Sequence, residues 1–197
     1  MRLLLASKSA ARREMLARAG VPFEIAEASV DEDAAKAGLL GAGFDPRGIA
    51  EELAQLKAFS ANAGSGDLVL GSDQTLELAD GTMLSKPTSR ADAKAQLRAM
   101  AGTTHRLHSA AVVAEAGEAV WWHCDTVELS MRLLSDKFIE AYLDAEYEQI
   151  RWSVGGYRIE GPGAQLFDRI EGSHFAILGM PLLPLLGYLR ERNVLAR

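Results

Sequence analysis

The sequence of 197 residues contains little cysteine and no long run of apolar residues. Its single cysteine, Cys124, cannot form an internal disulfide and has no second cysteine nearby for a metal site. We interpret Cys124 as a core or strand residue, because free cysteine usually behaves as a small buried hydrophobe. No stretch approaches the roughly 20 apolar residues of a membrane-spanning helix, and the opening apolar run is too short for a signal peptide. We therefore expect a cytoplasmic protein with no membrane partner.

Positive charge is also scarce. The chain has 21 Lys and Arg residues against 27 Asp and Glu residues, a formal net charge of −6. Binding along a nucleic-acid backbone needs clustered Lys and Arg, so we expect no nucleic-acid partner, and any phosphate site must be local. A chain of this length suits one α/β domain, and we predict that residues 1–197 form a single domain.

Several common catalytic motifs are missing from the sequence. It has no Walker lysine motif, no G-x-S-x-G nucleophile elbow and no glycine fingerprint for a dinucleotide. Histidine does not indicate a metal site either, because His105 and His108 are three apart in a strand pattern and should point to opposite faces. The neighbours Trp121 and Trp122 should likewise give one core and one surface residue.

The local patterns predict strands that alternate with helices. We expect strands at 3–6, 21–28, 68–71, 75–78, 106–115 and 119–132, and helices from after Ser9 to near Gly20, from Pro46 to Phe59, from Ser89 to Met100, from Ser135 to Leu143 and from Pro181 to Leu189. The acids at 31–33 are predicted on a loop at a strand end, and the glycine-rich stretch 34–44 on a mobile loop. The whole pattern favours a mixed sheet covered by helices, with ligand-binding turns at strand ends.

The stretch from Ser7 to Leu16 follows a short apolar strand and opens a helix. A helix start exposes unpaired N–H groups and the positive end of the peptide dipoles, so Ser7 and the arginines Arg12 and Arg13 indicate an anion site, with phosphate as the expected guest. The alternative is purely structural: Ser9 caps the helix, and the arginines are solvated.

Acids and lysines recur at other element ends. Asp31, Glu32 and Asp73 are the acids, and Lys57 and Lys86 are the lysines. Hydrolysis of a phosphoanhydride needs cations that neutralise the polyphosphate, carboxylates that hold Mg²⁺, and a group that positions or deprotonates water. Asp73 is predicted to lie on a turn directly after a buried strand, which makes it the best placed carboxylate, although an Asx turn alone would also explain it.

An ordered set of short motifs runs along the chain to the final helix. The motifs are Ser7-x-Ser9-x-x-Arg12-Arg13-x-x-Leu16, Asp31-Glu32, Lys57-Ala58, Gly71-Ser72-Asp73-Gln74, Ser85-Lys86-Pro87, Gly102-Thr103-Thr104-His105, Gly155-Gly156-Tyr157-x-Ile159-Glu160-Gly161 and Gly179-Met180-Pro181-Leu182. Taken in order, these motifs resemble those of the Maf family, the Maf-like nucleoside triphosphate pyrophosphatases, and the resemblance runs from residue 3 to the final helix.

The resemblance implies an α/β fold of the Maf/ITPase-like type, an elongated mixed β-sheet flanked by helices with a central nucleotide-binding cleft. It implies a cytoplasmic homodimer that uses a divalent metal cation, Mg²⁺ or Mn²⁺, to cleave a nucleoside triphosphate into the monophosphate and pyrophosphate. A house-cleaning role against modified nucleotides and an association with arrested septum formation are also implied. The main alternative from another class is a non-catalytic nucleotide-binding regulator of septum formation.

Matched position by position, the resemblance also implies residue roles. Glu32 and Asp73 serve the metal and the attacking water, with Asp73 as the general base. Phosphate would be held by Ser7, Arg12, Arg13, Lys57 and Lys86. The catalytic set is therefore Asp73, Glu32, Lys57 and Lys86.

Gln74 and Glu160 resemble the branch of the family that acts on 7-methylguanosine triphosphate, and the alternative is the branch that prefers dTTP and UTP. A carboxylate at Glu160 can accept both N–H donors of the guanine pairing edge and favours the cationic methylated base. Ala11 replaces a larger residue before the paired arginines, which also bears on base selectivity. Ala10, Ser85 and Ser109 depart from the common pattern without removing a charge.

Overall fold

The computed structural model describes residues 1–27 and 29–196. Its strands form one seven-stranded mixed sheet in the order β2-β1-β3-β5-β6-β7, with β4 paired to β3. β1 is parallel to β2 and β3, whereas β4 is antiparallel to β3 and β7 is antiparallel to β6. The strands are β1 (Leu3–Ala6), β2 (Glu24–Ile25), β3 (Leu68–Glu77), β4 (Met83–Leu84), β5 (Thr104–Glu115), β6 (Glu118–Met131) and β7 (Phe167–Glu171).

Helices flank this sheet, which confirms the predicted α/β class. They are α1 (Ala10–Arg18), α2 (Glu32–Gly41), α3 (Pro46–Ser60), α4 (Arg90–Met100), α5 (Asp136–Ile150), α6 (His174–Ile177) and α7 (Leu182–Glu191), with the 3-10 helices η1 (Val154–Gly156) and η2 (Pro162–Leu166). Among the described residues no helix combines the length and apolar character needed to cross a membrane.

The chain divides into two compact units. The first unit contains Met1–Gln74, His108–Asp125 and Ser173–Arg197, and the second contains Thr75–Leu107 and Thr126–Gly172. The single domain over residues 1–197 stays a prediction.

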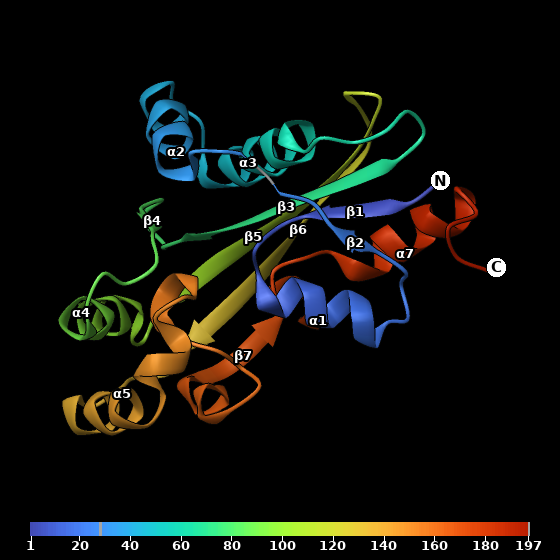
Figure 1. Ribbon diagram of the computed structural model, residues 1–197. Helices are drawn as coiled ribbons and strands as arrows, with labels where there is room; N and C mark the ends of the chain where they lie inside the picture. Colours follow the sequence, from blue (N-terminus) through green and yellow to red (C-terminus); the bar gives the residue numbers. More distant parts are fainter. Residues whose placement is uncertain (28, 197) are drawn as a thin grey trace. The chain divides into compact units, whose positions relative to one another are not determined.

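Strand alternation builds the core of the first unit on both faces of the sheet. Leu3 and Leu5 of β1 pack in one cluster with residues of α1 and α7, whereas Leu4 and Ala6 pack in another with alanines of α3. Figure 1 shows the same arrangement, with α3 on one side of β1 and with α1 and α7 on the other. Both faces of β1 are therefore buried, as its continuous apolar sequence requires.

Gly71 of β3 determines how closely α3 approaches the sheet. A Cβ atom at Gly71 would lie 2.1 Å from the Ala54 carbonyl oxygen and 2.5 Å from the Ala58 nitrogen. Since both are backbone atoms of α3, no larger residue fits without moving the helix. This close approach brings the end of α3 next to the middle of β3, where Asp73 lies.

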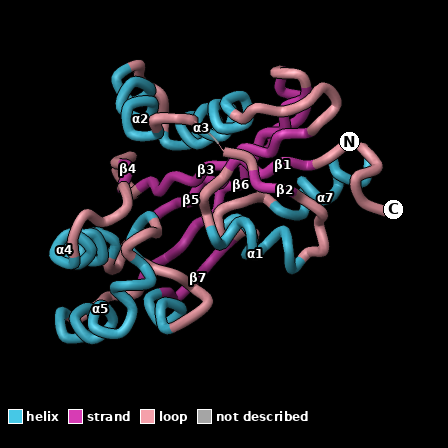
Figure 2. The backbone as a smooth tube through the Cα atoms, in the orientation of Figure 1, coloured by secondary structure: helices cyan, strands magenta, loops and turns pink. Residues whose placement is uncertain are grey.

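In the second unit, α4 packs against α5 and η1, and α4 and α5 run side by side in Figure 2. A small aromatic cluster lies in this unit's interior. His105 Nε2 is 2.8 Å from the Tyr157 hydroxyl, and Phe167 contacts both rings. Burial lowers the pKa of His105 to about 4, because the apolar surroundings disfavour the charged imidazolium.

Most predicted helix starts are confirmed. Ser9, Ser89 and Ser135 each cap a helix by accepting a backbone N–H, and Pro46 occupies the first position of α3. The long strand pair joined at Gly117 is also confirmed, with Gly117 at a φ of 84°.

Aromatic placement on β6 follows the prediction too. Trp121 stacks on Tyr188 at a centroid distance of 5.4 Å, whereas Trp122 is exposed. Cys124 is a half-buried strand residue, as expected, and burial raises the pKa of its thiol to about 12.

Two loop predictions are wrong. The acids at 31–33 and the glycine-rich stretch 34–44 lie mostly in α2, which begins after Asp31. The Asp31 carboxylate caps the helix by accepting the N–H of Ala34 at 3.0 Å, and two acids follow in the first turn, where the helix dipole favours negative charge. The cap of α2 and its packing against α3 stabilise this helix by more than its glycines destabilise it.

The strand predictions need three corrections. Residues 68–77 form one strand, so Asp73 lies in mid-strand rather than on a turn, because β1 and β5 flank β3 on both sides. The predicted strand at 21–28 shortens to Glu24–Ile25, with Ala28 outside the described residues. β7 was not predicted, and α5 continues seven residues past the predicted end at Leu143, to Ile150.

Candidate functional site

A buried lysine joins two carboxylates in the first unit. Lys57 lies near the end of α3 with only 6% of its side chain exposed. Its Nζ lies 2.7 Å from Asp73 Oδ1 and 3.0 Å from Glu32 Oε2. The Asp73 side chain is 12% exposed and that of Glu32 51%. The cluster is therefore closed at Asp73, open to solvent at Glu32, and carries more negative than positive charge.

The alternation of β3 explains why Asp73 meets Lys57. Val69 packs with the alanines of α3, and Gly71 touches the α3 backbone, so odd-numbered residues of the strand face this helix. Asp73 is the next odd-numbered position, and it reaches the lysine that α3 presents. Burying an ammonium without a partner is costly, and the ion pair to Asp73 offsets part of this cost.

A buried arginine lies at the start of α1. Arg12 donates from Nε to the Gly179 carbonyl oxygen at 2.8 Å and from Nη1 to Ser7 Oγ at 3.3 Å. Ser7 Oγ also accepts the N–H of Ser9, so the serine is held between the helix start and the guanidinium. Within the described residues no ion pair to Arg12 is found.

Arg12 is a desolvated cation in a negative field. Burial lowers the pKa of Arg12, whereas the charges of Asp73 and Glu32 raise it. An arginine remains charged under these conditions because its unperturbed pKa is so high. A guanidinium with N–H groups to spare, no paired carboxylate and a neighbouring helix start is suited to an incoming anion.

The even-numbered residues of β3 face the C-terminal part of the first unit. Ser72 Oγ donates to the Gly179 carbonyl oxygen at 3.1 Å. The Gln74 amide nitrogen lies within 3.1 Å of the Ala176 and Ile177 carbonyl oxygens and 2.9 Å from Ser109 Oγ. The nitrogen of this predicted base-selecting residue is therefore committed to protein acceptors, and the base-selecting role of Gln74 stays a prediction.

The predicted site residues fall into two groups. The structure brings together six of them in the first unit: Ser7, Arg12, Glu32, Lys57, Asp73 and Gln74. Arg13 and Ala11 are exposed on α1 in the same unit. Lys86 and Glu160 are exposed residues of the second unit, where Glu160 lies in the electrostatic field of Arg158. Their roles toward a substrate stay predictions.

Glu32 and Asp73 form a donor set that fits a divalent cation. Mg²⁺ commonly takes one or two protein carboxylates and completes its shell with substrate phosphates and water. The two carboxylates already share one cation, the Lys57 ammonium. In the described part of the chain no group of three or more His, Cys, Asp or Glu side chains could hold a metal ion. The two carboxylates would supply two oxygen ligands, and water or phosphate oxygens would have to supply the others.

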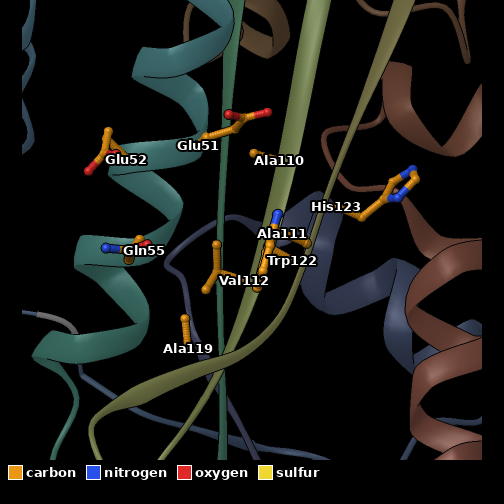
Figure 3. Close-up of a pocket in the computed structure, with 9 residues that line it drawn as sticks. All are labelled: Glu51, Glu52, Gln55, Ala110, Ala111, Val112, Ala119, Trp122 and His123. Carbon is orange, nitrogen blue, oxygen red and sulfur yellow. The ribbon is translucent and has the colours of Figure 1, made fainter.

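A separate pocket of the first unit contains none of the predicted site residues. It has a volume of about 240 Å³ and lies between α3 and the strands β5 and β6, where Figure 3 shows Glu51 extending from the helix toward the strands. Its floor consists of alanines and a valine, and Trp122 forms part of its wall. The position of this pocket therefore does not coincide with the predicted site residues.

Sequence reasoning assigned no role to Ser72 and Ser109 or to the carbonyl groups that these serines contact. Ser72 and Ser109 are fully buried polar residues inside apolar strand patterns, and each donates to a carbonyl oxygen of residues 176–179. Buried hydroxyls must find partners, so a serine within an apolar strand run was the available signal. The positive φ of 106° at Gly179 could not be deduced from a single glycine.

Comparisons with known proteins agree with this architecture. The sequence profile of a family described as Maf-like protein matches residues 2–192. A protein of Caulobacter vibrioides named nucleoside triphosphate pyrophosphatase is 47% identical, over 97% of this chain and 96% of its own. One of Sphingopyxis alaskensis with the same name is 49% identical over 98% of both chains. A protein of Rhizobium etli named 7-methyl-GTP pyrophosphatase is 47% identical over 96% of both chains.

Proposed function

Because this chain belongs to the Maf-like protein family, we propose that it is a nucleoside triphosphate pyrophosphatase, a hydrolase that converts its substrate to the monophosphate and pyrophosphate. Relatives that carry this name match nearly the whole chain at 45–49% identity. The observation that carries the proposal is the cluster in which buried Lys57 bridges Glu32 and Asp73, in the field of buried Arg12.

The cluster contains the groups that this reaction needs. In the proposed step, water attacks the α-phosphorus, the bond from this phosphorus to the oxygen that bridges to the β-phosphate breaks, and pyrophosphate leaves with that oxygen. Asp73 would accept the proton of that water, and Arg12 would bind phosphate oxygens through its remaining N–H groups. Lys57 holds Asp73 in place and offers a positive charge to the polyphosphate.

Glu32 and Asp73 would hold a divalent metal together with the substrate. The metal, Mg²⁺ or Mn²⁺, supplies positive charge to the phosphates when it is bound. Glu32 is the accessible ligand, since half of its side chain is exposed, and Asp73 is the buried one. The homodimeric state, the cytoplasmic location and the association with septum formation stay predictions of the resemblance.

We propose 7-methylguanosine triphosphate as the preferred substrate. Overall identity does not decide this question, because relatives with the general name and the relative named 7-methyl-GTP pyrophosphatase are about equally similar to this chain. The support comes from Glu160, an exposed carboxylate beside Gly161. A carboxylate accepts the two N–H donors of the guanine pairing edge, whereas the pairing edge of uracil or thymine has one donor between two acceptors.

A panel of standard and modified nucleoside triphosphates tests both parts of the proposal. Each nucleotide is incubated with the protein and Mg²⁺ or Mn²⁺, and pyrophosphate and phosphate are measured separately. We expect pyrophosphate only, no turnover in EDTA, and the highest kcat/KM for 7-methylguanosine triphosphate. Release of single phosphates, or full activity in EDTA, contradicts the reaction, and a preference for dTTP or UTP contradicts the substrate.

A further inference from the structure

We propose that the backbone carbonyl of Gly179, held in place by the Ser72 hydroxyl, orients the Arg12 guanidinium for phosphate binding. Gly179 and Ser72 are then positioning residues that act through Arg12. The inference rests on the proposed function to the extent that Arg12 is the phosphate-binding group there. It adds a role for a segment 167 residues away from Arg12 in the sequence.

The first step of the argument is the geometry of Arg12. Its Nε–H points at the Gly179 carbonyl oxygen at 2.8 Å, and one Nη1–H points at Ser7. A guanidinium is a planar, rigid fork, so fixing Nε and Nη1 also fixes the directions of the remaining N–H groups. Arginine binds phosphate best through such a preset pair of donors, which makes the orientation part of the affinity.

The second step is the geometry of Gly179. Its carbonyl oxygen accepts from both Arg12 Nε and Ser72 Oγ, so both acceptor positions are used. Gly179 has a φ of 106°, a region that side chains rarely adopt, and an added Cβ would lie 3.4 Å from Arg12 Nε. The backbone conformation therefore favours glycine here, and the added Cβ would only reach ordinary van der Waals contact with the guanidinium.

The third step is the anchoring of the neighbouring carbonyls. Ala176 O accepts from Ser109 Oγ at 2.6 Å and from Gln74 Nε2 at 2.8 Å, and Ile177 O accepts from Gln74 Nε2 at 3.1 Å. Side chains of two strands, β3 and β5, thus hold the end of α6 and the turn that follows it. Among the described residues, Ser72 is the one whose side chain donates to the carbonyl that Arg12 also contacts, so Ser72 and Ser109 do chemically similar work on different carbonyl groups.

A double-mutant cycle with a matched control tests whether Ser72, unlike Ser109, acts through Arg12. Ser72→Ala and Ser109→Ala each remove one fully buried hydroxyl that donates to a backbone carbonyl of residues 176–179. Each is combined with wild-type Arg12 and with Arg12→Lys, which keeps the charge but lacks the Nε–H donor. The probe is inorganic triphosphate in metal-free buffer, with its Kd measured by calorimetry and the melting temperature recorded for every variant. Arg12→Gln replaces Arg12→Lys in the cycle if the latter does not fold.

With Arg12 present, we expect Ser72→Ala to raise the Kd for inorganic triphosphate about five- to tenfold, and Ser109→Ala less than about twofold. In the Arg12→Lys background Ser72→Ala should change the Kd less than about twofold, because the group it acts through is gone. Both serine variants should lower the melting temperature by similar amounts, as a purely structural role would also predict. The coupling to Arg12 is what separates positioning from structure.

The inference is overturned if the two serine variants change the Kd equally, or if Ser72→Ala has the same effect in both Arg12 backgrounds. It is also overturned if the parent protein does not bind inorganic triphosphate. The proposed function is tested separately by nucleotide hydrolysis with the parent protein. If coupling is found without hydrolysis, the positioning role stands and the proposed reaction fails. If hydrolysis is found without coupling, the reaction stands and the positioning role fails.

Discussion

The two units use their charged residues in different ways. In the first unit two cations, Lys57 and Arg12, are buried, and Arg12 has no ion pair among the described residues. In the second unit the cations of α4 form ion pairs with acids of α5, and these pairs are half-exposed or exposed. They are Arg90–Glu140, Arg90–Asp144, Lys94–Glu140 and Arg98–Asp136.

This difference is one of energetic cost. Exposed ion pairs between two helices contribute little to stability and help to define how the helices pack. A buried cation costs several kcal/mol to desolvate, and its replacement by a well-packed apolar residue of similar size is often neutral or stabilising. The first unit keeps its buried cations in spite of this cost, in line with the substrate-binding roles proposed for them.

The largest expected effect compares one lysine from each unit. Lys57→Met leaves the buried Asp73 carboxylate without its cation, and we expect a loss of about 3–5 kcal/mol in the free energy of unfolding, measured by urea denaturation. Lys94→Met removes a helix-to-helix pair of the second unit and should cost less than about 1 kcal/mol. Mg²⁺ should restore part of the stability of Lys57→Met only. Equal losses in the two variants would remove the distinction between the units.

The next effect concerns His105, a buried histidine of the second unit. Its folded-state pKa of about 4 lies below the ordinary value of 6.5, so the unfolded state binds the proton more readily between these values. Stability from this group is complete above pH 6.5 and declines as the pH falls toward 4, by up to about 3 kcal/mol. His105→Gln should lose this component of the pH dependence.

The control for that experiment is His174→Gln, a change of an exposed histidine in the first unit. Urea denaturation at pH 7, 5.5 and 4 is compared for the parent and both variants. The parent and His174→Gln should show the same slope of stability against pH. A slope in His105→Gln as steep as that of the parent would show that the buried imidazole is not its source.

A third prediction concerns the buried carboxylate of the first unit. Asp73→Asn removes the proposed general base and one metal ligand, and we expect kcat to fall by at least about two orders of magnitude. Because Asp73 lies in a buried strand and not on an open turn, the melting temperature should fall as well. Turnover near that of the parent, in a variant with a native circular dichroism spectrum, would exclude Asp73 from the chemistry.

The smallest effect concerns Glu160, the exposed carboxylate of the second unit. Glu160→Gln keeps the shape of the side chain but exchanges one acceptor for a donor, which suits a pyrimidine better than a guanine. We expect the ratio of kcat/KM for 7-methylguanosine triphosphate over UTP to fall about tenfold, since a mispaired polar group costs roughly 1–3 kcal/mol. Stability should not change. An unchanged ratio would show that Glu160 does not select the base.

Local signals in the sequence were sufficient for much of the fold. The capping serines at 9, 89 and 135, the proline at the start of α3 and the long alternating strands around Gly117 act within a few residues of the chain. Capping geometry and side-chain alternation depend on near neighbours, so they can be deduced without the tertiary structure. The resemblance to the family likewise follows from the order of motifs along the chain.

The tertiary structure decided how those motifs meet. The sequence itself contains Lys57, Asp73 and the glycine at 71. Asp73 was predicted on a turn, but β3 pairs with β1 and β5, so Asp73 lies in a buried strand. The close approach of α3 at Gly71 then places the Lys57 ammonium against the Asp73 carboxylate. The contact of Arg12 with the Gly179 carbonyl joins residues 167 positions apart. Such contacts depend on strand pairing and backbone approach between distant segments, and no local pattern of residues encodes them.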